Sequence, residues 1–380
     1  MRRSILLALL LVSPLPAQEA KGPTYFPPPE STGGWQSLVP AKGAPSDIQK
    51  ATMLKLTGVD WDKLKEAWEV NAETDGSSGL LVICNGYVVG EWYKNGDKAK
   101  AFNIYSSSKA YTSLAFGQLL GDGTSKLTLD TKVCTADYLP EALPLPDPRK
   151  ADITLRHLLN MTSGVGADHV PEKQPFETAL GLTEKSPFAK LKADPGTTFH
   201  YSNAGVAHLV LLFEKAAGKD LSPFLKERLW TPIGVEKVRW EQIGGGKGEL
   251  GPLSQGFSGI FTTPREHARF CYLALHKGEW AGKRVVPAAH YDFAWTGTKA
   301  APGYGAQWWL AGQFKGAGVP KDFVATLGAY NNDGFVVPSL NLVFVRLGDS
   351  RKFPKEFKQQ LVQKVLAAVK TKEGSAGAGR

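Results

Sequence analysis

The stretch Ile104-Tyr105-Ser106-Ser107-Ser108-Lys109-Ala110-Tyr111 stands where strand-like sequence gives way to helix-like sequence, and it places a serine three residues ahead of a lysine. A serine hydroxyl is a poor nucleophile at neutral pH and needs a neighbour that takes its proton. If Ser106 opens a helix, Lys109 lies one turn further along on the same face. An amine there can act as the base once burial or a second cation lowers its pKa. The alternative interpretation of Ser106 is a helix N-cap without a chemical role.

A second pattern, His200-Tyr201-Ser202-Asn203, follows about ninety residues later. Its phenol could share proton transfer with the lysine, and its asparagine amide could orient the lysine and a substrate carbonyl. Tyr-x-Asn also occurs at Tyr93 and Tyr330, so the spacing alone does not select Tyr201. The alternatives are that Tyr201 is a half-buried aromatic residue and that Asn203 caps the following helix.

The segments around these two patterns predict strands near both ends of the chain and helices between them. Two β-rich runs flank Asn85-Gly86, which is the strongest short signal for a β-hairpin. A tight turn is expected at Asn331-Asn332-Asp333-Gly334. Between the strand regions, apolar residues recur at helical spacing. Strands are expected at 79–84, 87–93, 306–310, 323–327, 334–338 and 342–346, and helices at 58–72, 107–120, 154–161, 204–217, 222–229, 263–277 and 354–370.

This order of elements predicts an α+β fold. An antiparallel sheet formed from both chain ends is flanked by helices, and a mostly helical subdomain is inserted at about residues 120–260. Ser106 falls where the chain leaves the sheet for this insert. Ligand sites form preferentially in clefts between subdomains, so we expect the site there.

The chain is expected to divide into a signal, a leader, one domain and a tail. Residues 1–17 are interpreted as a secretory signal peptide, because two arginines precede an apolar run too short to span a bilayer and a small residue ends a cleavage site. Residues 18–57 form a Pro- and Gly-rich leader, residues 58–370 the domain, and residues 371–380 a disordered tail. We therefore expect an exported protein, periplasmic or extracellular, with no transmembrane segment in the mature chain.

Composition argues against several classes of function. The chain carries 45 Lys and Arg against 36 Asp and Glu, but the basic residues are scattered and no nucleic-acid partner is expected. The seven histidines show no metal-ligand spacing, so neither a metal nor another cofactor is expected. Cys84, Cys134 and Cys271 imply no disulfide framework, although one bridge is left open.

Seven segments carry patterns of one known family: residues 88–93, 105–109, 153–164, 195–205, 259–269, 304–309 and 336–346. In this order they resemble the serine β-lactamase and penicillin-binding protein superfamily, in particular its class C-like branch. That branch also holds D-Ala-D-Ala carboxypeptidases, family VIII esterases and 6-aminohexanoate-dimer hydrolases. The resemblance covers roughly residues 60–370, and its "PGxxFxYSNxG" segment selects Tyr201 among the three Tyr-x-Asn matches. The absence of a Gly-x-Ser-x-Gly elbow disfavours an α/β-hydrolase.

The resemblance implies a role for each residue of the two patterns. Ser106 would be the acylated nucleophile, and Lys109 would be the general base or would lower the pKa of Tyr201. Tyr201 would act as a base toward the serine and as an acid toward the leaving group. Asn203 would hold Lys109 and a substrate amide. Backbone N–H groups of Ser106 and of the strand edge near Asn332 would form the oxyanion hole, and which group removes the first proton is left open.

The family's third motif departs from its pattern in this chain. In the family it reads Lys-Thr-Gly or His-x-Gly on the strand before the Asn331-Asn332 turn, and the equivalent triplet here is Ala329-Tyr330-Asn331. The cation that would meet a substrate carboxylate is missing, and a larger residue replaces the glycine. Tyr330, Asn331 and Asn332 are the expected substrate-binding residues of a site that accepts a neutral ester or amide.

The sequence thus predicts an exported serine hydrolase that forms an acyl-enzyme with a small-molecule ester, amide or peptide. A β-lactamase or D-Ala-D-Ala carboxypeptidase is the alternative among enzymes, and a catalytically silent cell-wall-binding protein is the alternative from another class. Ser106, Lys109 and Tyr201 together argue against the silent protein, whereas the altered third motif argues for it or for a changed specificity. The oligomeric state is not specified by the sequence.

Overall fold

The computed structural model describes residues 25–314 and 318–370. The predicted signal peptide at 1–17, the first part of the leader and the predicted tail at 371–380 lie outside the described residues.

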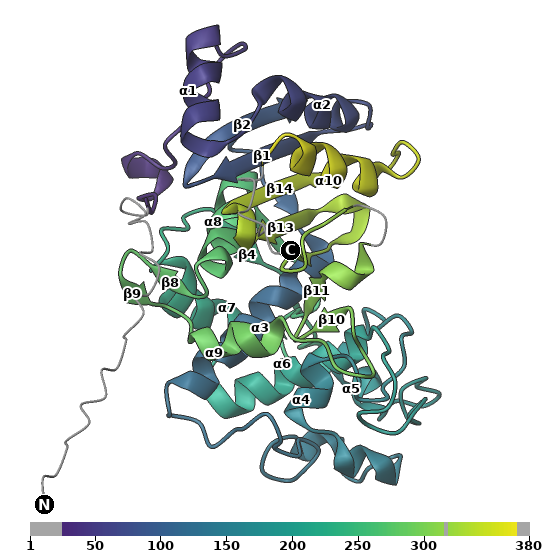
Figure 1. Cartoon of the computed structure of the whole chain (residues 1–380). Helices are drawn as coiled ribbons and strands as arrows, with labels where there is room; N and C mark the ends of the chain where they lie inside the picture. Colours follow the sequence, from purple (N-terminus) through teal and green to yellow (C-terminus); the bar gives the residue numbers. More distant parts are fainter. Residues whose placement is uncertain (1–24, 315–317, 371–380) are drawn as a thin grey trace, which may run out of the picture.

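A seven-stranded antiparallel sheet forms the centre of the upper part of the molecule in Figure 1. Its strand order is β10-β11-β12-β13-β14-β1-β2, so the last strand of the chain pairs with the first long one. The predicted α+β fold, with a sheet built from both chain ends, is confirmed. The strands are β1 (Ser78–Cys84), β2 (Tyr87–Lys94), β10 (Tyr304–Gly305), β11 (Trp308–Leu310), β12 (Val324–Thr326), β13 (Asp333–Val337) and β14 (Leu342–Gly348).

The predicted hairpin joins β1 and β2. Asn85 and Gly86 both have left-handed backbone angles, with φ of 52° and 83°. A two-residue turn of this kind needs positive φ at both central positions, which asparagine and glycine tolerate best. The hairpin therefore forms where the sequence predicts it.

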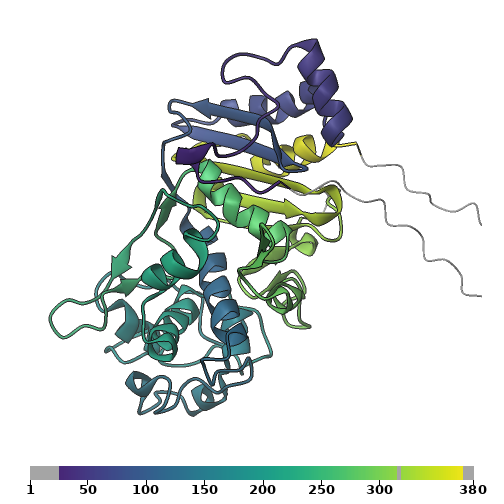
Figure 2. The same ribbon diagram turned by 90° about the vertical axis from the view of Figure 1, so that its left-hand side faces the viewer.

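Helices cover both faces of the sheet, as Figure 2 shows. α2 (Trp61–Ala72) and α10 (Phe357–Ala367) pack together on one face, and α8 (Pro264–Leu275) lies on the other. Because successive side chains of a strand point to opposite faces, β1 contributes to two cores. Leu80 and Val82 join the core under α2 and α10, whereas Leu81 and Ile83 join the core under α8.

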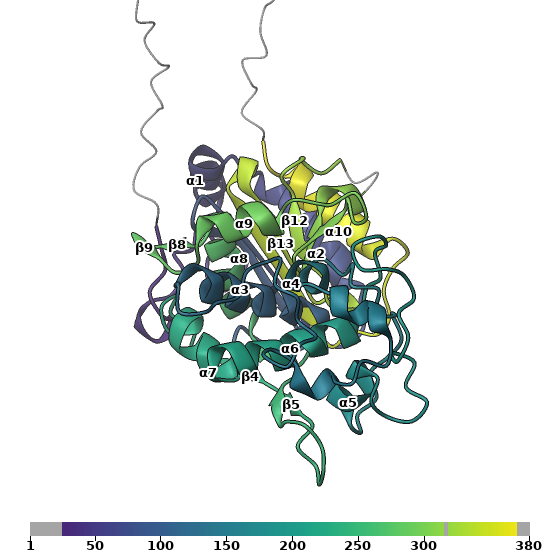
Figure 3. The ribbon, with the colours of Figure 1, turned by 90° about the horizontal axis from the view of Figure 1, so that it is seen from below.

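The chain between the two halves of the sheet forms the predicted, mostly helical insert. In Figure 3 the long helices α3 and α6 lie side by side with the shorter helices around them. A small sheet of order β3-β7-β4 closes the insert, and its strands were not predicted. No helix in the described parts of the chain has the length and apolar content needed to cross a membrane. The elements are β3 (Phe102–Asn103), α3 (Ser108–Gly121), α4 (Leu155–Leu159), α5 (Pro175–Leu180), α6 (Asn203–Ala217), α7 (Leu221–Leu225), β4 (Val238–Trp240), β5 (Gln242–Ile243), β6 (Leu253–Ser254), β7 (Ile260–Thr262), β8 (Glu279–Trp280), β9 (Lys283–Arg284) and α9 (Ala288–Ala294).

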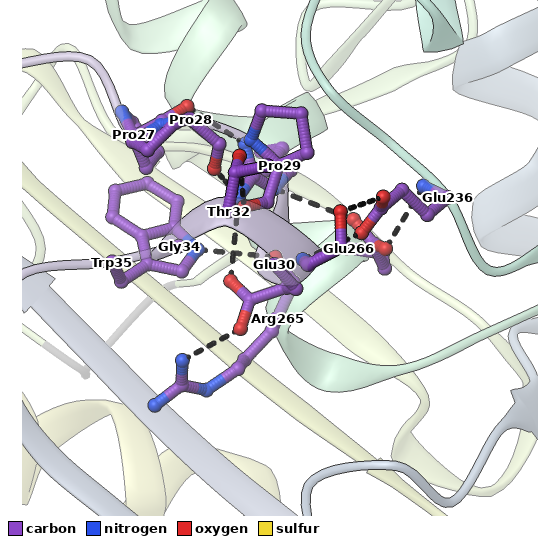
Figure 4. A network of polar contacts seen from close by, with 12 residues as sticks. Pro27, Pro28, Pro29, Glu30, Thr32, Gly34, Trp35, Glu236, Arg265 and Glu266 are labelled. Atoms are coloured by element: carbon purple, nitrogen blue, oxygen red, sulfur yellow. Dashed lines mark hydrogen bonds and ion pairs between the residues drawn. The ribbon is translucent and has the colours of Figure 1, made fainter.

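The described part of the predicted leader packs against the domain instead of standing apart from it. Residues 25–39, here called the N-terminal strap, run beside β2, where Val88 exchanges backbone hydrogen bonds with Gln36 and Leu38. Figure 4 shows how the strap is fixed: Arg265 forms an ion pair with Glu30 at 2.8 Å. Buried arginines and carboxylates are stable only when paired, so this network ties the strap to α8.

The leader also contains a helix that was not predicted, α1 (Asp47–Thr57). Ser46 and Gln49 form a capping box, in which each side chain accepts a hydrogen bond from the other residue's backbone N–H. The difference from the predicted leader at 18–57 therefore has a local cause, which is a helix start signal within the Pro- and Gly-rich segment.

All three cysteines are buried and free. The disulfide that the sequence left open is therefore not formed. Burial raises the pKa of the Cys84 thiol to about 12 and that of Cys134 to about 11, so both thiols stay protonated at neutral pH.

Candidate active site

Ser106, the predicted nucleophile, lies in a single 3-10 turn, Tyr105–Ser107, that leads directly into α3 and is here called the nucleophile turn. The turn is fixed on both sides. Ser107 Oγ donates to the backbone oxygen of Asn332 at 2.7 Å, and Ser108 Oγ accepts from the Ile260 N–H at 3.2 Å. Of the three consecutive serines, only Ser106 remains partly exposed, so it is the one whose hydroxyl a substrate can reach.

Lys109 lies one helical turn beyond Ser106 and points back toward it, as the spacing predicts. Its Nζ is 2.9 Å from Ser106 Oγ and donates to the Phe257 carbonyl oxygen at 2.7 Å. Its side chain is buried, with 1% exposed. Burial without a neighbouring carboxylate lowers the pKa of Lys109 well below its ordinary value, which favours the neutral amine. A neutral amine can donate to the carbonyl and still offer its lone pair to the serine hydroxyl.

Tyr201 completes the group around Ser106. Its ring lies 4.9 Å from Lys109 Nζ and stacks on Trp309 with 5.6 Å between the ring centroids. Burial raises the pKa of Tyr201 to about 12, against a smaller lowering by its hydrogen bond with the Ser106 side chain. The phenol therefore keeps its proton at neutral pH, and the structure brings it to Ser106 together with Lys109.

Asn203 is the first residue of α6, and its side-chain oxygen is buried. Ser202 caps the helix, because its Oγ accepts from the Gly205 N–H at 3.0 Å, so Asn203 does not act as the cap. No hydrogen-bond partner for Asn203 Oδ1 is found among the described residues, and none links it to Lys109. An unpaired buried acceptor is costly unless a ligand satisfies it.

The three residues expected to bind substrate have different surroundings. Tyr330 is 42% exposed and meets the Tyr105 ring edge-on, with 5.4 Å between centroids. Asn331 is half-buried in the same turn. Asn332 is fully buried, and its side chain accepts from the Gly348 N–H at 2.7 Å and donates to the Ala329 carbonyl at 2.9 Å. Both polar atoms of the Asn332 side chain are therefore used within the protein, and a contribution of this position to substrate binding stays a prediction.

The third-motif triplet also lies elsewhere than predicted. Residues 329–331 form a 3-10 turn with left-handed angles at Tyr330 and Asn331, so they have left the strand. β12 ends at Thr326, and Leu327 and Gly328 follow it before the turn. A Cβ added at Gly328 would lie 2.2 Å from the Ile104 carbonyl oxygen, so this position beside the nucleophile turn requires glycine. The chain thus places a glycine, and no charged side chain, between the end of β12 and the turn at 329–331.

The comparisons with known proteins agree with this geometry. A family model described as Beta-lactamase matches residues 79–368. The chain belongs to the β-lactamase family. It is 29% identical over 216 residues to penicillin-binding protein 4 of Amycolatopsis lactamdurans, covering 50% of this chain and 54% of that protein, so it matches about half the relative's length.

Solved structures show the fold of this β-lactamase-family protein. A penicillin-binding protein homologue from Caulobacter crescentus superposes with a TM-score of 0.64 at 14% identity, over 81% of this chain and 97% of that one. EstCE1, described as a hydrolase with promiscuous acyltransferase activity, superposes with a TM-score of 0.62 at 18% identity, over 84% and 100% of the two chains. The predicted resemblance to the β-lactamase and penicillin-binding protein superfamily is confirmed.

Two features of this β-lactamase-family chain near the site could not be predicted from the types of residue in its sequence. Phe257 contributes a backbone carbonyl to Lys109, and any residue could supply that group. His157, which lies within the family-like segment 153–164, serves as a cap: its Nδ1 accepts from the Thr154 N–H at 3.2 Å. In the described residues, no three His, Cys, Asp or Glu side chains gather as a metal site requires.

Proposed function

We propose that this protein is an exported serine hydrolase that forms an acyl-enzyme with a carboxylic ester or amide. The observation that carries the proposal is the 2.9 Å contact between Ser106 Oγ and the Nζ of a buried Lys109, which has no carboxylate partner among the described residues. A neutral lysine next to a partly exposed serine is the arrangement that activates a hydroxyl for attack.

In the proposed reaction, Lys109 takes the proton of Ser106 as Oγ attacks the substrate carbonyl carbon. The tetrahedral intermediate collapses when the bond to the alcohol or amine breaks, and the phenol of Tyr201 gives that leaving group its proton. The lysine ammonium returns a proton to the phenolate, so the charges balance. Water then attacks the acyl-enzyme with the same groups acting in reverse, which releases the acid and restores the serine hydroxyl.

The developing oxyanion needs two N–H donors. We assign one to Ser106 and the second to Ala329, which follows the close approach of Gly328 to the nucleophile turn. The neighbouring backbone N–H groups are engaged: that of Gly328 donates to Asp333 Oδ1 at 3.0 Å and that of Asn332 to the Ala329 carbonyl at 3.4 Å. Asn203 Oδ1 would accept an N–H of an amide substrate, which would satisfy its unpaired acceptor.

One observation supports an ester or amide over a β-lactam or D-Ala-D-Ala peptide. β12, the strand that ends beside the nucleophile turn, consists of Val324, Ala325 and Thr326 and so carries no charge for a carboxylate. Export rests on the signal-like residues 1–17.

The test is intact-mass spectrometry of the purified protein after incubation with a fluorophosphonate and, separately, with a penicillin. We expect one fluorophosphonate adduct, lost in Ser106→Ala and retained in Ser107→Ala, whose hydroxyl is held by the Asn332 carbonyl. An adduct on the Ser106→Ala variant would overturn the assignment. A stable penicillin adduct would favour the penicillin-recognising alternative, and no adduct with either reagent would favour the catalytically silent protein.

A further inference from the structure

Two aromatic residues of one hairpin contact the ring of Tyr201. Trp309, in β11, stacks on this ring with 5.6 Å between the centroids and 23° between the planes. Tyr304, in β10, meets the same ring edge-on at 6.1 Å and also meets Trp309 edge-on at 5.0 Å. Lys109 Nζ lies 4.9 Å from the Tyr201 centroid. Stacked and edge-on contacts both depend on how a ring is turned, so together they favour one orientation of the phenol.

The hairpin and the segment that carries the tyrosine are fixed to the same short piece of chain, residues 159–161 at the end of α4. From the turn between β10 and β11, the Gln307 side chain donates to the Leu159 carbonyl at 2.7 Å. From the other segment, the N–H of His200 donates to the Met161 carbonyl at 2.8 Å. Because both segments are bonded to one anchor, the stack of the two rings is a fixed feature of the fold.

We propose that Trp309 is a positioning residue: by stacking on Tyr201, it holds the phenol where it can give its proton to the leaving group. A tyrosine side chain turns about two bonds, and a displacement of about 1 Å in an active site can cost on the order of a hundredfold in rate. A tryptophan presents a large, rigid surface that fixes the plane of a ring stacked on it. This inference rests on the proposed function and adds a residue that acts through Tyr201 without touching the reacting atoms.

Two other roles for Trp309, which is half-buried, predict different kinetics. A residue that only packs against the core affects stability and leaves the folded protein equally active on all esters. A wall that contacts the substrate affects esters according to their shape. A residue that positions the acid affects esters according to how much the leaving group needs a proton.

The experiment compares kcat/KM for 4-nitrophenyl acetate and 4-nitrobenzyl acetate, which share the acyl group and differ by one CH2 in the leaving group. The 4-nitrophenolate ion leaves without a proton, whereas the 4-nitrobenzyl alkoxide needs one as the C–O bond breaks. The constant kcat/KM covers the steps up to acylation, in which this bond breaks. For each variant, the measured quantity is the ratio of the 4-nitrobenzyl to the 4-nitrophenyl value.

The variants are Trp309→Phe, which keeps a ring, and Trp309→Leu and Trp309→Met, which keep only an apolar side chain. Tyr201→Phe is the reference for loss of the acid itself. Trp295→Leu is the matched control, because Trp295 is also half-buried and also packs on aromatic rings, at 5.4 Å from Tyr291 and 6.0 Å from Trp308. Among the described residues, no ring contact joins Trp295 to Tyr201. Circular dichroism first checks that each variant is folded.

We expect the ratio to fall between about tenfold and about a hundredfold in Trp309→Leu and Trp309→Met, and less in Trp309→Phe. Tyr201→Phe should lower the ratio at least as much. In the double variant of Trp309→Leu and Tyr201→Phe, the ratio should fall no further than in Tyr201→Phe alone, because the tryptophan acts only through the phenol. Trp295→Leu should leave the ratio unchanged.

An unchanged ratio in Trp309→Leu or Trp309→Met, whichever folds, would overturn the inference. Equal losses on the two esters would also overturn it and assign Trp309 to the packing or wall role. Losses that multiply in the double variant would do the same, because Trp309 would then act by a route other than Tyr201. Failure of the proposed function looks different: the unmodified protein would hydrolyse neither ester and take no fluorophosphonate, and the inference would then fall with it.

Discussion

Lys109 is the residue on which the proposed chemistry depends most, and its buried position disfavours the charged form of its side chain. Its Nζ has only the Ser106 hydroxyl and a carbonyl as close polar partners in the described structure. Burying an ammonium group with such partners costs more than burying the neutral amine. Tyr201 is affected in the opposite sense, since burial keeps its proton on the phenol. The two shifts favour the lysine as the base and the tyrosine as the acid of the proposed reaction.

The pH dependence of kcat/KM follows from these shifts. The ammonium form of Lys109 cannot accept the serine proton, so activity should rise with pH through the lowered pKa of Lys109 and be lost as the pH falls below it. No falling limb is expected until the pH approaches about 12, where Tyr201 loses its proton. The measurement is ester hydrolysis across the pH range in which circular dichroism shows the protein folded. A bell-shaped profile that falls well before that value would contradict the assignment of acid and base.

At the scale of elements, the closest approach in the site joins the end of β12 to the turn before α3. Gly328 lies at this approach, and an added Cβ would meet the Ile104 carbonyl at 2.2 Å and the Asn332 carbonyl at 2.6 Å. Backbone atoms on both sides leave no flexible group to move aside. The position of the strand relative to the nucleophile turn therefore depends on the absence of a side chain.

Gly328→Ala should push the strand end away from the nucleophile turn. Overpacking of this kind costs about 1–3 kcal/mol of stability, and displacement of the second oxyanion donor should lower kcat/KM at least about tenfold. Denaturant unfolding and ester kinetics measure the two effects. Gly312→Ala is the control, since its added Cβ would meet nothing nearer than 3.8 Å. Equal activity of the two variants would show that the contact does not position the site.

The elements that could be predicted from sequence are those long enough to show a periodic pattern of apolar residues and those marked by characteristic turn residues. The hairpin carries Asn85-Gly86 between two β-rich runs, and α3 continues the Ser106 pattern with helical spacing. Strands of two or three residues, such as β3 and β7, are too short to show alternation, and only distant pairing creates them. α1 did have a signal, the Ser46 to Gln49 capping box, within a segment whose Pro and Gly content suggested a leader.

The candidate site also contains residues that the local sequence could predict and residues that it could not. Ser106 and Lys109 could be placed because both lie on one helix, where spacing fixes direction. The roles of Asn332 and Gly328 depend on where β12 ends and on how closely the chain passes Ile104. Neither the end of the strand nor this close approach can be predicted from the local sequence. The third-motif triplet was consequently placed on the turn instead of the strand.

At the scale of the whole molecule, the two ends of the chain meet in one sheet. β14 lies between β13 and β1, with Ser78 opposite Gly348 and Cys84 opposite Leu342, and every residue of β14 is buried. The two parts of the sheet, β10-β11-β12-β13 and β1-β2, cannot join until the last strand of the chain is in place. Such long-range pairing makes folding slow and cooperative, because the loop between the paired strands must close first.

A chain that ends at Asn341 lacks β14 and α10 and should not fold, because β13 and β1 lose their shared neighbour. A chain that ends at Lys370 keeps both elements and should unfold in one cooperative transition like the full-length protein. Soluble yield and thermal unfolding followed by circular dichroism distinguish the two. A cooperative transition in the shorter chain would show that the N-terminal half of the sheet is independently stable.

The three buried cysteines have a practical consequence for work on this molecule. Maleimides react with accessible thiolates, and burial raises the pKa of the Cys84, Cys134 and Cys271 thiols. The folded chain should therefore not react with maleimide dyes, even when its own three cysteines are left in place. One cysteine introduced at an exposed position, for example Ala329→Cys beside the nucleophile turn, would carry a fluorophore at a single known site. The fluorescence of that label would then change when a substrate binds.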